Sequence, residues 1–210
     1  MKRIPHFALL IKKHGIPDLK RGNDPFQALC RSIIYQQVSG KAAATVFARF
    51  VALFPMSAPS AHTGEYFPSS ARFPTPTEVA AMPIEKLRSV GLSGQKAAYI
   101  KDLAEKFAGG VVKHDVLHTM KNEEIIEHLT QIKGVGVWTV QMFLIFTLNR
   151  LDVLPTGDLG IQKGFQIVYK LRKLPSAAHM ERLAKPWREH ASVASWYLWR
   201  AADGAKAQRK

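Results

Sequence analysis

The chain has 210 residues, with 30 Lys and Arg against 16 Asp and Glu, so its formal net charge at pH 7 is +14 and its isoelectric point lies near 10. A hydrophobic fraction of 47% is enough for one sizeable core or two fused lobes, and the single cysteine, Cys30, excludes an intrachain disulfide and a four-cysteine zinc or iron–sulfur site. Neither a run of about 18 uncharged apolar residues nor the apolar core of a signal peptide is present, so we expect an intracellular protein.

The basic charge favours a polyanionic partner, DNA or RNA, over the alternatives of a membrane surface or mere solubility. Apolar residues recur at helical spacing along nearly the whole chain, and no segment alternates convincingly with period two. The sequence therefore predicts an all-α fold.

In the first half of the chain, Asp24 followed by Pro25 is typical of an N-cap with a first-turn proline. Cys30, on the helix that follows, is expected as a buried apolar residue. The stretch 55–76 holds five prolines and is expected to be a surface loop. Helices are predicted at residues 4–14, 26–39, 41–54, 77–82, 83–90 and 95–107.

In the second half, Asn122 is expected to cap a helix whose acidic residues lie in its first turn. The basic tail, residues 205–210, is expected to be frayed. Helices are predicted at residues 123–130, 138–148, 160–171, 176–183 and 187–202.

Two glycines, Gly134 and Gly136, interrupt the helical pattern near residue 135, and the pattern resumes at Trp138. This predicts a helix, a tight turn and a second helix. Glycines can take positive φ and let a phosphate approach the bare backbone, while the amides at the start of the second helix carry the positive end of its dipole. Such a turn binds nucleic acid without reading bases.

Asp158 follows Pro155-Thr156-Gly157 and precedes an apolar helix, so its simplest role is an N-cap. The cap is compatible with chemistry, because a helix N-terminus favours the ionised carboxylate, which can stabilise a developing cation or orient water. Asp152 is the nearby competitor, but it lacks a capping position of its own.

Four segments, in this order along the chain, resemble the helix-hairpin-helix DNA glycosylases, and specifically their alkylation-repair branch of the 3-methyladenine DNA glycosylase II type. They are Arg31-Ser32-Ile33-Ile34-Tyr35-Gln36-Gln37-Val38-Ser39, Gly91-Leu92-Ser93-Gly94-Gln95-Lys96-Ala97-Ala98-Tyr99-Ile100, Ile132-Lys133-Gly134-Val135-Gly136-Val137-Trp138-Thr139 and Pro155-Thr156-Gly157-Asp158-Leu159-Gly160-Ile161. One Gly-Val-Gly hairpin is a weak signal, whereas four segments in family order are a specific one.

The resemblance implies a two-lobed helical fold with DNA in the cleft between the lobes. One lobe would span residues 19–150 and contain the helix-hairpin-helix motif at about 123–148; the other would combine residues 1–18 with 151–210. We expect a monomer that binds duplex DNA containing damaged bases, located in the nucleus of a eukaryote or in the cytoplasm and nucleoid of a prokaryote.

By motif position Asp158 matches the catalytic aspartate of the family. Trp138 stands where the strand-cleaving branch has a catalytic lysine, so the resemblance implies a monofunctional enzyme that forms no Schiff base and leaves an abasic site. The single cysteine likewise separates the chain from relatives that carry an iron–sulfur cluster, and no cofactor is expected to be required.

The pocket for the extruded base is expected to be aromatic, with Trp138 and Trp196 at family positions and Met142 one turn from Trp138. A core role remains the alternative for both tryptophans. Trp187 and Trp199 are expected in the core.

Gln37 falls at the family's intercalating wedge, although Val38 or Tyr35 could insert instead, and a solvated helix end is the plain alternative. DNA contacts are expected at Gln37, Val38, Lys133, Gly134, Val135, Gly136 and Thr139. The resemblance also suggests a structural Na⁺ or K⁺ held by the main chain of Thr130, Ile132 and Val135.

We therefore expect excision of alkylated purines such as 3-methyladenine and 7-methylguanine, the first step of base excision repair. Two alternatives stay open at this point: a non-enzymatic DNA-binding protein that uses the hairpin only for docking, and a glycosylase for another lesion, such as uracil or ethenoadenine.

Overall fold

The computed structural model describes residues 5–19, 22, 24–54 and 72–207, and all regular structure within them is helical. The predicted all-α class is confirmed. The chain divides into two compact units, each described here by itself: the hairpin unit, Gly22–Phe143, and the terminal unit, Met1–Arg21 with Leu144–Lys210. Helix α8 (Val137–Phe146) begins in the hairpin unit and ends in the terminal unit. Among the described residues, no helix combines the length and the apolar character needed to span a membrane.

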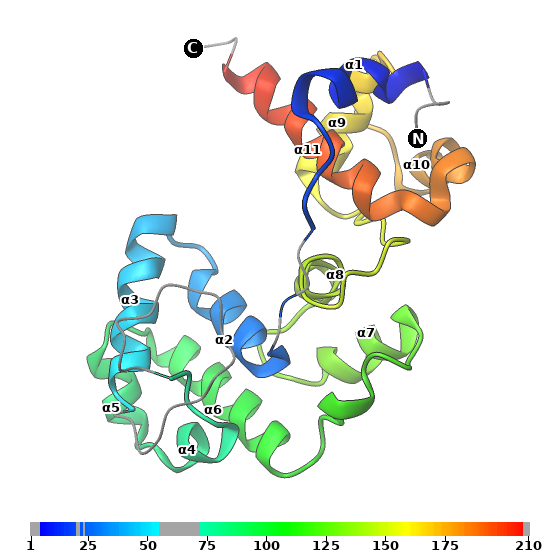
Figure 1. Ribbon diagram of the computed structural model, residues 1–210. Helices are drawn as coiled ribbons and strands as arrows, with labels where there is room; N and C mark the ends of the chain where they lie inside the picture. The colour runs from blue at the N-terminus through cyan, green and yellow to red at the C-terminus, as the bar shows by residue number, and fades with distance from the viewer. Residues whose placement is uncertain (1–4, 20–21, 23, 55–71, 208–210) are drawn as a thin grey trace. The chain divides into compact units, whose positions relative to one another are not determined.

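In the hairpin unit, α6 is the central helix and packs against α2, α4 and α5 (Figure 1). Its buried residues include Ile100, Leu103 and Phe107, and the Phe107 ring lies 5.3 Å from that of Phe26 on α2. The helices before α8 are α2 (Pro25–Tyr35), α3 (Gly40–Ala52), α4 (Pro76–Ala81), α5 (Ile84–Ser89), α6 (Gly94–Ala108), the short 3-10 helix η1 (His114–Val116) and α7 (Asn122–Thr130).

The predicted start of α2 is confirmed. The Asp24 carboxylate accepts hydrogen bonds from the amides of Phe26 at 2.8 Å and Gln27 at 3.2 Å, and Pro25 occupies the first turn. Cys30 is fully buried, and this burial raises the pKa of its thiol well above the ordinary value. Its predicted role as a core residue is also confirmed.

The predicted extension of α2 to residue 39 is wrong. The helix ends at Tyr35, because Gln36 leaves the helical region with ψ of 132° and Gln37 follows in a left-handed conformation with φ of 55°. Gly40, which the predicted ranges leave between two helices, is the first residue of α3. Ser39 caps this helix by accepting from the amide of Ala42 at 3.4 Å. A loop therefore separates α2 from α3.

The start of α7 also differs from the prediction. Asn122 is the first helical residue rather than the cap, and the Glu124 side chain accepts from the Lys121 amide at 2.7 Å. Of the predicted loop 55–76, residues 55–71 lie outside the described part of the chain. Thr75 caps α4, which begins at Pro76.

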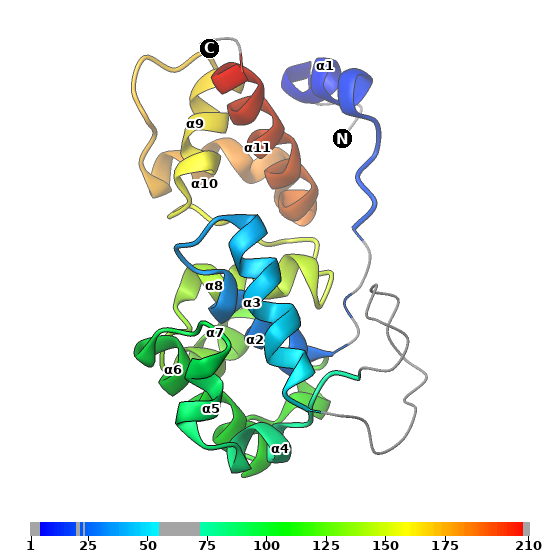
Figure 2. The ribbon, with the colours of Figure 1, turned by 90° about the vertical axis from the view of Figure 1, so that its left-hand side faces the viewer.

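The terminal unit contains α1 (Pro5–His14), the end of α8, α9 (Leu159–Val168), α10 (Ala177–Ala184), the 3-10 helix η2 (Lys185–His190) and α11 (Ala191–Ala207). Helix α9 lies along α11 (Figure 2). A β-carbon at Gly164 would stand 2.4 Å from the carbonyl oxygen of Leu198, so only glycine permits this approach.

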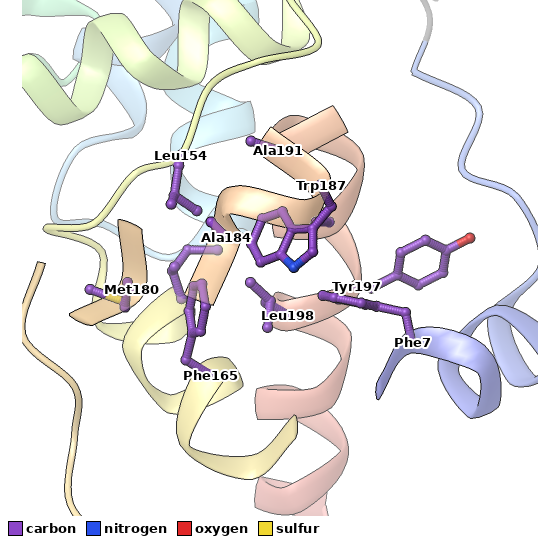
Figure 3. Close-up of a cluster of buried hydrophobic side chains, with 11 residues drawn as sticks. Phe7, Leu154, Phe165, Met180, Ala184, Trp187, Ala191, Tyr197 and Leu198 are labelled. Atoms are coloured by element: carbon purple, nitrogen blue, oxygen red, sulfur yellow. The ribbon is translucent and has the colours of Figure 1, made fainter. Parts of the chain in front are cut away.

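Trp187 lies in the core of the terminal unit, as predicted, between Phe7 and Phe165 (Figure 3). Ring centroids are separated by 5.5 Å for Phe7–Trp187 and 5.7 Å for Phe165–Trp187. The predicted helix 187–202 begins later, at Ala191, because Trp187 has a non-helical φ of −136°. At its other end it continues to Ala207, so the expectation of a frayed tail is wrong for residues 205–207, and residues 208–210 lie outside the described part.

Candidate functional site

The predicted hairpin joins α7 to α8. The Val135 amide donates to the Ile132 carbonyl at 3.0 Å, and the Val140 amide donates to the Gly136 carbonyl at 3.1 Å. Gly136 is therefore the residue from which α8 starts, and helix geometry aims the first amides of α8 out of the helix end. This arrangement is the one expected of an anion-binding turn.

The two hairpin glycines have different roles. Gly134 has φ of 80°, and a β-carbon there would lie 2.1 Å from the Tyr99 ring on α6. Gly136 is not in the left-handed region, and a β-carbon there would meet no atom within 4 Å. The expectation of positive φ holds for Gly134 alone. Gly134 thus allows the hairpin to pack against Tyr99, whereas the absence of a side chain at Gly136 leaves its backbone open to a ligand.

Asp102 on α6 binds the hairpin at Lys133. Its Oδ2 accepts from the Lys133 amide at 2.9 Å, and its carboxylate pairs with Lys106 Nζ at 2.6 Å. Burial opposes ionisation of Asp102, but the hydrogen bonds from Lys106 and the Lys133 amide outweigh it and hold the pKa of this carboxyl below its ordinary value. The Lys133 amide is thereby engaged inside the protein. The Lys133 side chain is 72% exposed, and its Nζ lies 3.8 Å from Asp102 Oδ1.

Two residues predicted to contact DNA have buried side chains. Val135 is 4% exposed and Thr139 is 5% exposed. The main chain and the side chain of both residues are buried, so neither residue offers an exposed surface to DNA. The side chains exposed where α8 begins are those of Val137 and Trp138, at 52% and 49%.

The loop between α2 and α3 presents the predicted wedge. Gln37 and Val38 are exposed at its tip. Tyr35 instead packs against the Phe47 ring at 6.3 Å and lies under the Arg31 guanidinium at 4.5 Å. Of the three wedge candidates, the structure thus favours Gln37 or Val38 over Tyr35.

The loop and Trp138 on α8 line a common cavity of about 350 Å³. It is lined by Ser32, Tyr35, Gln36, Gln37 and Trp138. The exposure of Trp138 speaks against its alternative role as a core residue. Met142, which was expected beside Trp138, is half-buried. Two predicted site residues, Gln37 and Trp138, therefore line one cavity within the hairpin unit.

Asp158 caps α9 in the terminal unit, as its sequence position predicts. Its Oδ1 accepts two hydrogen bonds, from the Ile161 amide at 2.8 Å and from the Trp199 indole Nε1 at 2.9 Å. The side chain is half-buried. Both donors fix the direction in which the carboxylate points.

The turn before Asp158 is held by its own hydrogen bonds. The Asp158 amide donates to the Pro155 carbonyl at 3.0 Å, and the Thr156 amide donates to the Leu154 carbonyl at 2.9 Å. Gln162 Nε2 on α9 donates to the Thr156 carbonyl at 3.1 Å. The carboxylate thus follows a turn whose backbone is fixed by hydrogen bonds.

Trp199 packs against the core of the terminal unit, as expected, but it also contacts Asp158, which was not predicted. Trp199 is half-buried, and its ring stacks on Phe146 at 6.0 Å while its Nε1 reaches Asp158. A β-carbon at Gly160 would stand 2.8 Å from Trp199 Cδ1 and 2.9 Å from Asp158 Oδ1. A glycine in the first turn of an otherwise apolar helix was the signal of this close contact.

Trp196, the other predicted pocket residue, contacts different groups. Its ring lies edge-on to His14 at 6.2 Å and Tyr197 at 5.1 Å, and the Arg200 guanidinium lies 4.7 Å from its centre. The competitor Asp152 is exposed, and its carbonyl accepts from Arg188 Nη1. Trp199, rather than Trp196, is therefore the tryptophan hydrogen-bonded to the Asp158 carboxylate.

The carbonyls predicted to hold a cation belong to the end of α7 and the turn after it. Thr130 is the last helical residue, a position where carbonyls have no partner within the helix, and the Ile132 carbonyl keeps a second lone pair beside its bond from Val135. Neutral oxygens of this kind suit Na⁺ or K⁺, so the carbonyls of Thr130 and Ile132 have the chemistry that the expected ion requires.

Residues 30–189 match the family described as "HhH-GPD superfamily base excision DNA repair protein". The chain belongs to this superfamily. The HhH-GPD chain is 35% identical over 180 residues to "DNA-3-methyladenine glycosylase 1" of Schizosaccharomyces pombe, which is 85% of this chain and 73% of that protein. It is also 35% identical over 162 residues to "DNA-3-methyladenine glycosylase" of Saccharomyces cerevisiae, where the match covers 76% of this chain and 51% of that protein.

Solved structures agree with this assignment. The HhH-GPD chain superposes on the Schizosaccharomyces pombe 3-methyladenine DNA glycosylase Mag1, solved in complex with abasic DNA, with a TM-score of 0.73 and 34% identity over 94% of this chain and 91% of that one. For DNA-3-methyladenine glycosidase of Bacillus halodurans, the TM-score is 0.76 with 30% identity over 99% and 93%. The family predicted from the sequence, and its alkylation-repair branch, are confirmed.

Proposed function

We propose that this HhH-GPD protein is a monofunctional DNA glycosylase that hydrolyses the N-glycosidic bond of alkylated purines in duplex DNA and leaves an abasic site. The observation that carries the proposal is the placement of Asp158. It is a carboxylate at a helix N-terminus, with one oxygen held by the Ile161 amide and the Trp199 indole, in a chain whose relatives are named as 3-methyladenine DNA glycosylases.

A single fixed carboxylate suits this reaction. Breaking the bond between base and deoxyribose builds positive charge on the sugar, and a nearby anion lowers the barrier to that step. The anion is most effective when it needs no reorganisation during the reaction. The hydrogen bonds that Asp158 Oδ1 accepts, together with the hydrogen-bonded turn before Asp158, hold the carboxylate in place before the reaction begins.

The monofunctional character rests on Trp138. In the family pattern this position carries the lysine of the strand-cleaving branch, and an indole cannot form a Schiff base with the sugar. Hydrolysis by water, assisted by Asp158, then releases the base without cutting the strand.

The substrate class follows from the relatives and from the aromatic character of the site. A base that alkylation has made cationic is attracted to the electron-rich face of a tryptophan, and Trp138 is exposed enough to offer such a face. We therefore place 3-methyladenine and 7-methylguanine ahead of uracil and ethenoadenine, which are neutral.

The partner is duplex DNA. The net charge of +14 favours its approach. The hairpin would contact a phosphate through the first amides of α8 and the open backbone at Gly136, with the exposed Lys133 side chain adding charge. A Na⁺ or K⁺ on the carbonyls of Thr130, Ile132 and Val135 would strengthen this contact. Excision itself would require neither this ion nor a further cofactor, and the protein would act as a monomer.

A base-release assay tests the proposal. The protein is incubated with genomic DNA methylated in vitro, and released bases are separated by chromatography. Release of 3-methyladenine and 7-methylguanine is the expected result. Binding to DNA without release of any base would favour the non-enzymatic alternative, and release confined to uracil or ethenoadenine from oligonucleotides carrying those lesions would move the enzyme to another substrate class.

A further inference from the structure

Gln36 connects the loop between α2 and α3 with the hairpin. Its Nε2 donates a hydrogen bond of 2.9 Å to the carbonyl of Gly134, which lies 98 residues later in the chain. Gln36 is the residue at which α2 stops, and the exposed Gln37 follows it. One side chain thus links the element that presents the wedge to the element that presents the phosphate anchor.

The main chain of Gln36 is held as well. Lys96 Nζ on α6 donates to the carbonyls of Gln36 and Ile34, both at 2.7 Å. Burial lowers the pKa of the Lys96 amine. Gln36 is therefore fixed at its carbonyl by α6 and at its amide group by the hairpin.

The same face of α6 also supports the hairpin. Lys96, Tyr99 and Asp102 are spaced three residues apart and so lie along one side of the helix. Lys96 holds the Gln36 carbonyl, the Tyr99 ring lies directly against Gly134, and Asp102 accepts from the Lys133 amide. The loop and the hairpin therefore both contact this side of α6, and the Gln36 side chain joins them directly by its hydrogen bond to Gly134.

We propose that Gln36 is a positioning residue that sets the loop tip, Gln37 and Val38, at a fixed distance from the phosphate-binding hairpin, so that the grip on the DNA backbone drives extrusion of the base. The inference rests on the proposed glycosylase function and adds a role for a residue that does not itself need to touch the lesion. Extrusion leaves a gap in the base stack that a protein side chain must fill, and a filler that is free to move back from the duplex fills it poorly.

The proposal predicts a separation between DNA binding and base extrusion. Gln36→Met keeps the length and bulk of the side chain but removes the amide donor. We expect affinity for undamaged duplex to stay within about twofold of wild type, while single-turnover excision and the extrusion signal of a 2-aminopurine next to the lesion fall about fivefold to tenfold, the size expected from one net hydrogen bond. Gln36→Asn, which keeps the amide on a shorter side chain, should reproduce the loss.

The matched control is Gln166→Met. Gln166 on α9 also donates its side-chain amide to a backbone carbonyl, that of Arg172 at 3.3 Å, and it is outside the hairpin unit. This variant should excise like wild type. Thermal unfolding of each variant, without DNA, checks that the extrusion signal does not follow a loss of folded protein.

A double-mutant cycle distinguishes positioning from an independent role. If Gln36 acts through the tip, Gln36→Met should change extrusion little in a protein that already carries Gln37→Ala and Val38→Ala. Wild-type extrusion and excision in Gln36→Met, or effects that simply multiply in the combined variant, would overturn the inference while leaving the glycosylase function in place. A wild-type protein that releases no alkylated base would instead overturn the proposed function.

Discussion

The indole Nε1 of Trp199 donates a hydrogen bond of 2.9 Å to Oδ1 of Asp158, joining the last helix of the chain to the N-terminus of α9. Gly160 leaves room for the contact, because a β-carbon there would crowd both Trp199 and Asp158 at less than 3 Å. Helix α11 therefore does more than fill the core of the terminal unit. It supplies a donor that orients the carboxylate proposed to act on the sugar.

The first prediction concerns the charge of Asp158. Asp158→Asn keeps an oxygen that can accept from Ile161 and Trp199, so the cap and the fold should persist, but it loses the anion that opposes the sugar cation. Single-turnover excision should fall about 100-fold or more, whereas affinity for lesion-containing duplex should remain. Asp152→Asn, at an exposed position nearby, is the control and should excise normally. Wild-type excision by Asp158→Asn would remove Asp158 from the mechanism.

The second prediction concerns the orientation of that carboxylate. Trp199→Phe removes the donor but keeps an aromatic ring to stack on Phe146. We expect the single-turnover rate to fall about tenfold, in line with a hydrogen bond to a charged group, with affinity for abasic-site DNA nearly unchanged. A purely structural role would instead lower thermal stability and binding together.

Gly160→Ala tests the same contact from the other side. Its β-carbon would crowd both Trp199 and Asp158, so we expect a similar fall in rate. Gly157→Ala, where a β-carbon meets nothing within 4 Å, is the matched control and should excise like wild type. Equal rates for the two alanine variants would show that the indole contact does not matter for catalysis.

The local features of the fold could be read from the sequence because short-range patterns determine them. The Asp24 and Asp158 caps, the hairpin and the buried Cys30 each depend on residues within a few positions. The end of α2 could not be read in this way, because no glycine or proline follows Tyr35 before Gly40. Gln36, at which the helix stops, is held by Lys96 and Gly134, which are distant in sequence.

The site shows the same limit. Asp158 was predicted from its motif. Helical spacing correctly places Trp199 against the core, but it does not show that the indole also reaches the Asp158 carboxylate. Thr139 and Val135 were expected to contact DNA from their place in the hairpin motif, but Val135 in the turn and Thr139 on α8 are both buried, which the motif alone does not show. Contacts between distant segments, such as Gln36 with Gly134, leave no mark in a single sequence.

The third prediction separates the two hairpin glycines. Gly134→Ala combines an unfavourable left-handed conformation with a clash against Tyr99, and should lower the free energy of unfolding by about 2–5 kcal/mol. Gly136→Ala should change stability by no more than about 1 kcal/mol but weaken binding to damaged and undamaged duplex alike, with a smaller dependence on salt. Thermal unfolding and fluorescence anisotropy measure the two effects.

A second-site change checks the cause of the Gly134 effect. In a Tyr99→Ala protein the clash is gone, so Gly134→Ala should cost less there than in the wild type. An equal cost in both backgrounds would assign the whole effect to backbone conformation. Unchanged DNA affinity in a folded Gly136→Ala protein would show that the hairpin backbone is not the phosphate anchor.

The last prediction concerns the fate of the DNA strand. Trp138 stands where the strand-cleaving branch has its lysine, so we expect water, and not an amine of the protein, to attack the sugar. A lesion-containing duplex should therefore stay intact until alkali cleaves it at the abasic site. Incubation under borohydride, which reduces a Schiff base to a stable adduct, should trap no protein on the DNA. If an adduct formed, Lys133→Gln and Lys163→Gln would show which amine had acted: loss of the adduct in one variant would identify the nucleophile and make the enzyme bifunctional.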